Sequence, residues 1–117
     1  MQENTTYQLT VRLFKGEKCF GPGVARLLRL VGELHSLRAA AASMGMAYSK
    51  AWRITRECEQ ALGFPLLISI TGGKNGGGAT LTPEALDMLR RYDAFLSDLQ
   101  LAADALMDKH FSKREQG

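Results

Sequence analysis

A chain of 117 residues, 45% of them apolar, is long enough for one domain with a modest core and too apolar for a disordered protein. Its formal net charge of +3 is mildly basic, which suits a nucleic-acid binder without establishing one. The sequence has no apolar run of membrane-spanning length and no basic-then-apolar leader. We therefore expect a single cytoplasmic domain over residues 1–117 that makes no membrane contact.

The cysteines and histidines predict no metal site. Cys19 and Cys58 are far apart and lack metal-type spacing, so two reduced thiols are expected. His35 and His110 have no potential co-ligands nearby in the sequence. No metal and no cofactor are expected.

The chain is expected to begin with a β-hairpin over residues 7–20. Apolar and polar residues alternate from Tyr7 to Phe14, which is typical of a half-buried strand. The segment from Lys15 to Lys18 predicts a turn, and Cys19 and Phe20 can form a short return strand, ended by residues 21–23.

Three helices are expected to form the core over residues 24–62. The first has an apolar stripe from Val24 to Leu34, and Ser36 is the expected N-cap of an alanine-rich second helix reaching about Met44. Gly45 is expected to adopt a positive φ in the turn that follows. The third helix is expected over residues 48–62, with Gly63 as its terminating residue.

The third helix has an apolar back and a basic front. Apolar residues recur every three or four positions, at Ala47, Ala51, Ile54, Cys58, Ala61 and Leu62. The polar and basic residues Ser49, Lys50, Arg53 and Arg56 fall on the other side. A packed small-residue helix, a glycine turn and such a helix are typical of a DNA-binding helix-turn-helix, although a helical hairpin with a solvated charged face gives the same pattern.

A hairpin of the kind called a wing is expected over residues 66–81. An apolar, β-branched segment ends at Ile70, a glycine-dense loop carries Lys74, and residues 79–81 can return as a second strand. The loop is not a phosphate-binding P-loop, because Asn75 follows Lys74 where serine or threonine is required.

The last element is expected to be a long helix over residues 82–109, with Thr82 as N-cap and Pro83 at its first position. At 1.5 Å per residue this helix would be about 40 Å long, more than a small domain can cover. Its heptad-like seam predicts a homodimer interface formed by Leu89, Tyr92, Leu96, Leu99, Ala103 and Leu106. The expected fold class is mainly α with a small β wing (α+β), a winged helix-turn-helix with a C-terminal dimerisation helix.

The segment from Gly45 to Trp52, the glycine loop from Thr71 to Ala79 and the Leu81-Thr82-Pro83 helix start resemble the DNA-binding domain of molybdate-responsive regulators of the ModE family, whose helix-turn-helix is related to LysR-type regulators. The resemblance covers about residues 20–106 and implies DNA binding and dimerisation. Full-length family members carry molybdate-binding C-terminal domains, for which this chain has no room. Molybdate sensing is therefore not expected. The sequence does not identify a separate effector-binding partner.

The expected function is a sequence-specific, dimeric transcription regulator that binds duplex DNA through the third helix and the wing. No catalytic arrangement of side chains stands out, so an enzyme is not expected. Trp52 is expected to pack between helices. The alternatives are a protein-interaction module without DNA binding and, more weakly, oxyanion binding at the glycine loop. The residues expected to contact DNA are Ser36, Tyr48, Ser49, Lys50, Arg53, Arg56, Lys74 and Asn75.

Overall fold

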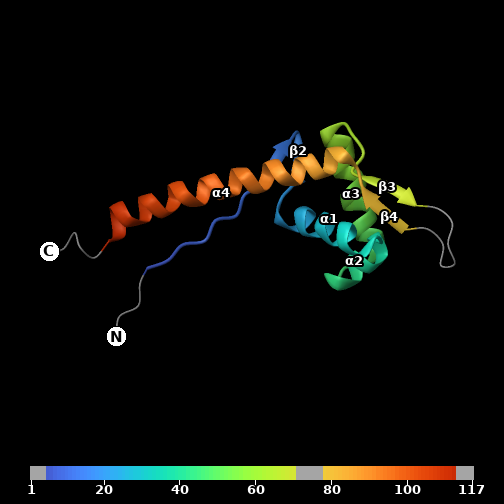
Figure 1. Cartoon of the computed structure of the whole chain (residues 1–117), viewed down its shortest axis with the longest axis horizontal. Coiled ribbons are helices and arrows are strands. Elements are labelled where there is room, and N and C mark those ends of the chain that lie inside the picture. Colours follow the sequence, from blue (N-terminus) through green and yellow to red (C-terminus); the bar gives the residue numbers. More distant parts are fainter. Residues whose placement is uncertain (1–4, 71–77, 113–117) are drawn as a thin grey trace.

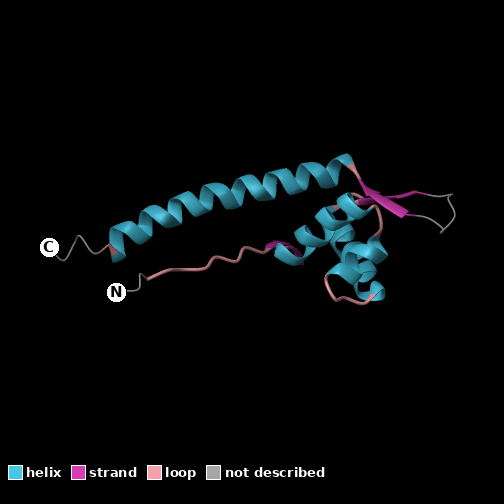
Figure 2. Ribbon diagram, turned by 60° about the horizontal axis from the view of Figure 1, so that its bottom comes forward, coloured by secondary structure: helices cyan, strands magenta, loops and turns pink. Residues whose placement is uncertain are grey.

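The computed structural model describes residues 5–70 and 78–112, and it has the expected mainly helical fold with small hairpins and a long C-terminal helix (Figures 1 and 2). In chain order the elements are β1 (Leu13–Lys15), β2 (Glu17–Phe20), α1 (Pro22–Leu34), α2 (Leu37–Ser43), α3 (Tyr48–Leu62), β3 (Leu67–Ile70), β4 (Gly78–Leu81) and α4 (Pro83–Phe111). Each hairpin forms its own two-stranded antiparallel sheet.

The leading hairpin is shorter than the alternating sequence predicts. Strand β1 begins only at Leu13, which pairs with Phe20, because the return strand β2 has four residues and offers no ladder beyond that point. Residues 5–12 are extended without a strand partner and run beside α4 (Figure 1). The hydroxyl of Tyr92 donates to the carbonyl of Val11 at 2.7 Å, and the hydroxyl of Tyr7 contacts Asp104, so α4 takes the place of a neighbouring strand.

Helix α1 begins at Pro22, two residues earlier than predicted. Proline is favoured in the first helical turn because its missing N–H would have no intrahelical partner there. The helix ends at Leu34, and its C-cap residue His35 has a φ of 57°, in the left-handed region that is uncommon for residues other than glycine.

The predicted caps and turns of the helical core are confirmed. The Ser36 hydroxyl accepts a hydrogen bond from the Ala39 N–H at 2.9 Å, and Thr82 caps α4 in the same way through the Ala85 N–H. Gly45 and Gly63 have φ values of 65° and 89°, where a side chain would be strained.

The buried side of α3 differs from the predicted stripe. Ala51 and Cys58 are buried as expected, but Ala47 is exposed, and Ile54, Ala61 and Leu62 are only half-buried. Thr55 is buried instead, and its hydroxyl donates to the Ala51 carbonyl at 2.8 Å. This hydrogen bond removes the cost of burying a polar group, which is why apolarity alone missed the position.

The core consists of two clusters on either side of α1. One packs α1 against α2 and the wing and contains Leu27, Val31, Leu37, Ala40, Ala41, Ala51 and Ala79. The other joins β2, α1, α3 and α4, and its Phe20 and Tyr92 rings meet edge to face with centroids 5.1 Å apart.

This second cluster also buries Leu89, so Leu89 and Tyr92, two residues of the predicted dimer seam, belong to the chain's own core. Beyond them α4 projects away from the helical core, in a molecule of 67 × 33 × 21 Å (Figure 2). Across the described residues, no helix combines the length and apolarity needed to cross a lipid bilayer.

Candidate nucleic-acid interface

The front of α3 is open to solvent. Ser49, Lys50, Arg53 and Arg56 are all exposed, and the side chain of Arg53 is 59% accessible. The described part of the chain therefore leaves this basic helix face uncovered. Because the buried residues of α3 anchor the opposite side in the core, this face is held at a fixed orientation.

The wing lies beside α3. Strands β3 and β4 pair in regular antiparallel register from Leu67–Leu81 to Ile70–Gly78. The wing's base is tied to the core, because the Thr82 N–H donates to the Leu66 carbonyl at 3.0 Å. Lys74 and Asn75, which were predicted to contact DNA from the wing tip, lie outside the described residues.

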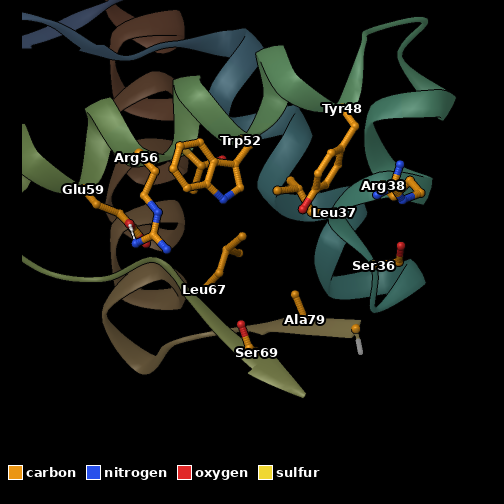
Figure 3. A pocket seen from close by; sticks show the side chains of 12 residues that line it. Ser36, Leu37, Arg38, Tyr48, Trp52, Arg56, Glu59, Leu67, Ser69 and Ala79 are labelled. Atoms are coloured by element: carbon orange, nitrogen blue, oxygen red, sulfur yellow. Dashed lines mark hydrogen bonds and ion pairs between the residues drawn. The ribbon is translucent and has the colours of Figure 1, made fainter. Parts of the chain in front are cut away.

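A hollow of about 330 Å³ separates α3 from the wing (Figure 3). It brings together three predicted contact residues, Ser36, Tyr48 and Arg56, and adds Arg38 and Trp52, which sequence reasoning did not propose as contacts. The full lining comprises Ser36, Leu37, Arg38, Tyr48, Trp52, Thr55, Arg56, Glu59, Leu67, Ser69, Gly78 and Ala79.

Arg38 and Tyr48 form a cation–π pair at one end of this hollow. The guanidinium carbon of Arg38 lies 4.1 Å from the centroid of the Tyr48 ring, and both side chains are exposed. Arg38 lies near the start of α2, just after the Ser36 cap. The fold, and not the periodicity of α2, brings this cation beside the start of α3, which is why the sequence contains no signal for it.

Trp52 does not pack between helices, contrary to the prediction. It is 47% exposed and borders the hollow, with the guanidinium carbon of Arg56 5.0 Å from its ring centroid. The physical reason is the close approach of α2 and α3 through Ala40, Ala41 and Ala51, which fill that contact and leave no space for an indole.

The two arginines on the front of α3 differ in how firmly they are held. Arg56 pairs with Glu59 at 3.2 Å, and the same Glu59 carboxylate accepts the Leu66 N–H at 2.7 Å. Among the described residues, the ion-pair partner of Arg53 is the exposed Glu57, at a longer distance of 3.8 Å. Arg53 is therefore freer to reach a ligand, whereas Arg56 is fixed beside Trp52 and the wing.

The side chains on this surface are of types that bind ligands. The surface offers guanidinium, ammonium, hydroxyl and aromatic groups on a convex helix flanked by a hairpin, and such groups bind phosphates and base edges. Within the part of the chain that the structure describes, no three histidine, cysteine or acidic residues lie close enough to hold a metal ion.

Comparison with known proteins agrees with this geometry. Residues 24–86 match the family model described as "Bacterial regulatory helix-turn-helix protein, lysR family". The chain is 33% identical over 107 residues to the transcriptional regulator ModE of Haemophilus influenzae, a match that covers 92% of this chain and 42% of the relative.

Two further relatives give the same result. The DNA-binding transcriptional dual regulator ModE of Escherichia coli K12 is 34% identical over 101 residues, covering 86% of this chain and 38% of that protein. The molybdenum-pterin-binding protein MopB of Rhodobacter capsulatus is 37% identical over 68 residues, covering 58% and 25% respectively. The chain thus spans less than half the length of each of these relatives.

Proposed function

Since this chain belongs to the LysR-type family of bacterial regulatory helix-turn-helix proteins and is related to the ModE regulators, we propose that it binds duplex DNA as a dimer and regulates transcription. In this proposal α3 enters the major groove, and the wing contacts the flanking backbone. The observation that carries the proposal is the uncovered front of α3, where Ser49, Lys50 and Arg53 are exposed beside a fixed hairpin.

Base readout is assigned to the part of this front that is free to move. Arg53 has the fork geometry that matches the two acceptors of a guanine edge, and its contact with Glu57 is weak enough to be exchanged for DNA. Lys50 and Ser49, in the first turn of α3, reach bases or phosphates near the helix N-terminus.

Phosphate contact is assigned to the hollow between α3 and the wing. Ser36, Arg38 and Tyr48 lie on one side of it and the wing strands on the other. In this proposal the hydroxyl and guanidinium groups of the hollow bind the phosphate backbone and not the bases. They therefore fix the position of a helix on the duplex without reading its sequence. Lys74 and Asn75 stay in the proposal as wing contacts on the strength of the sequence alone.

Dimerisation is assigned to the projecting half of α4. Of the predicted seam, Leu99, Ala103 and Leu106 lie beyond the domain core, whereas Leu96 packs partly against it. Phe95 and Ala102 are exposed apolar residues beside this part of the seam. With Leu99 and Leu106 they form an apolar stripe whose residues are spaced by four, three and four positions. This is the spacing of a coiled-coil seam, and a helix this exposed gains stability from a partner.

The test is a binding titration of the purified chain with duplexes selected from a random pool, at about 50 and 200 mM salt. We expect binding of a defined sequence that weakens steeply with salt, because lysine and arginine release counterions from phosphates. Failure to select any duplex, or affinity that salt leaves unchanged, would overturn the proposal in favour of a protein-interaction module.

A further inference from the structure

A second hollow lies on the other side of α3 from the wing. It has a volume of about 430 Å³ and is bounded by the leading hairpin, the start of α1 and α3. Four cationic residues border it, Arg12 and Lys18 from the hairpin region and Lys50 and Arg53 from α3. Glu57 is the one acidic residue among the described residues of the lining, and it already contacts Arg53 at 3.8 Å.

The two hollows divide the surface of α3 between them. Tyr48, Trp52 and Arg56 border the hollow beside the wing, whereas Lys50, Arg53 and Glu57 border the second one. Among the residues that the structure describes, none lines both hollows. The exposed front of α3 therefore lies between two β-hairpins, with the wing on one flank and β1–β2 on the other.

We propose that the leading hairpin is a second wing, which contacts the sugar–phosphate backbone of DNA through Arg12 and Lys18. This inference rests on the proposed function, because it places the hairpin against the same duplex that α3 enters. Arg12 and Lys18 contact the strand that borders the major groove on the side away from β3–β4. Such contacts neutralise phosphates and carry no sequence information.

The distribution of charge and burial favours a nucleic-acid backbone at this position. The four cationic side chains are exposed, while Cys19, Phe20 and Cys58 at the floor of the hollow are buried in the core. The wall between them includes the half-buried Val24, Met46 and Ile54, so it is the four charges at the rim, and not a lack of apolar surface, that favour a nucleic-acid backbone. Arg12 and Lys18 continue, from the hairpin region, the basic front that Lys50 and Arg53 form on α3, and a row of charges of this kind suits an extended polyanion.

Arg12 is held close to the start of α1. A Cβ added at Gly21 would lie 3.0 Å from the Arg12 Cγ, so the aliphatic part of this side chain passes directly over the glycine. The close approach fixes the stem of Arg12 next to the hollow, while its guanidinium end stays exposed. The cation is thus partly ordered in the free protein.

The test compares Arg12→Gln and Lys18→Gln with Lys109→Gln, a matched loss of charge near the far end of α4. Affinity is measured over a salt series for a duplex that the unmodified chain selects from a random pool and for a scrambled duplex of equal length. We expect Arg12→Gln and Lys18→Gln to weaken binding by the same factor on both duplexes and to lower the salt slope by about 1 each. Lys109→Gln should match the unmodified chain.

The possible results separate this inference from the proposed function. If the unmodified chain binds its selected duplex and both hairpin variants behave like Lys109→Gln, the second wing is refuted and the role of α3 stands. A loss confined to the selected duplex would also refute it, because a backbone contact cannot discriminate sequences in that way. If the unmodified chain binds neither duplex, both proposals fail. Thermal unfolding of each variant confirms that these exposed substitutions leave the fold intact.

Discussion

The carbonyl oxygen of His35 accepts a hydrogen bond from the backbone N–H of Ala79 at 3.1 Å, which ties the wing to the end of α1. His35 is the left-handed residue that ends α1, and Ser36 next to it caps α2. One short segment therefore sets the positions of two helices and of strand β4. Because the wing is attached at this point, its distance from α3 depends on the geometry around His35.

Gly78→Ala should disturb that attachment. A Cβ at position 78 would lie 2.4 Å from the His35 carbonyl oxygen, which is backbone and cannot rotate away. We expect a loss of about 1–3 kcal/mol in the free energy of unfolding and weaker DNA binding, because β4 must shift from α1. Urea unfolding and a binding titration measure the two effects.

Gly23→Ala is the matched control for this substitution. A Cβ there meets nothing within 4 Å, and the residue lies in the first turn of α1. Alanine should leave stability unchanged or raise it by about 0.5–1 kcal/mol, since glycine loses more entropy in a helix. Equal behaviour of the two variants would contradict the importance of the Gly78–His35 contact.

Glu59→Ala should destabilise the junction between α3 and the wing. The Glu59 carboxylate accepts the N–H of the fully buried Leu66 at 2.7 Å, so its removal leaves a buried donor without a partner. The expected cost is about 1–3 kcal/mol, measured by urea unfolding. Glu57→Ala removes an exposed carboxylate from the same helix and should stay within about 0.5 kcal/mol. Similar losses for both variants would show that the Leu66 contact contributes little.

The features that sequence predicted well are those set by a few neighbouring residues. The Ser36 and Thr82 caps and the left-handed glycines at 45 and 63 depend on local backbone chemistry. The apolar and basic sides of α3 follow from helical periodicity, so the spacing of its residues was enough to predict which side faces solvent.

The errors arose where a distant segment decides the outcome. Residues 7–12 alternate like a strand and are extended, but α4 lies beside them, and alternation alone does not show which element a segment packs against. Trp52 is large and apolar, which favoured a buried position, but it lies on the solvent side of α3 with Ser49 and Arg56, and alanines make the contact between α2 and α3. Arg38 joins the site through Tyr48, a residue ten positions away on the next helix.

Arg53→Ala should lower DNA affinity while leaving the fold intact. The side chain is 59% exposed and has one long ion-pair contact, so its loss disturbs little in the free protein. If Arg53 makes a bidentate contact to guanine, the loss is about 1–3 kcal/mol, or roughly 5- to 150-fold in Kd. Arg53→Lys keeps the charge and loses the fork, so it should retain non-specific binding and lose sequence preference. Unchanged affinity in Arg53→Ala would remove Arg53 from the interface.

Leu106→Glu should shift the chain from dimer to monomer. Leu106 lies on the apolar stripe of α4 beyond the domain core, and a carboxylate there would be buried without a partner in a helix-to-helix interface. Sedimentation equilibrium over a range of concentrations measures the association. Leu101→Glu changes an even more exposed leucine that lies off this stripe, and it should leave the dimer intact. Equal weakening by both variants would argue against the stripe as the interface.

Alkaline pH should destabilise the fold through Cys58. Burial, together with the neighbouring Cys19, raises the pKa of the Cys58 thiol from 9.0 to about 12. A raised pKa in the folded state means that the contribution to stability is complete below about pH 9 and is lost progressively as pH rises toward 12. Above pH 9 the unfolded chain releases this proton and the folded chain keeps it, which costs up to about 1.4 kcal/mol per pH unit. Urea unfolding at pH 8, 9 and 10 under reducing conditions measures this slope.

Cys58→Ala is the control for the pH prediction. The substitution lowers stability at every pH by leaving a small cavity, but it should remove the part of the slope that begins near pH 9. Parallel pH profiles for the two proteins would show that the thiol ionises as easily in the folded chain as in the unfolded one.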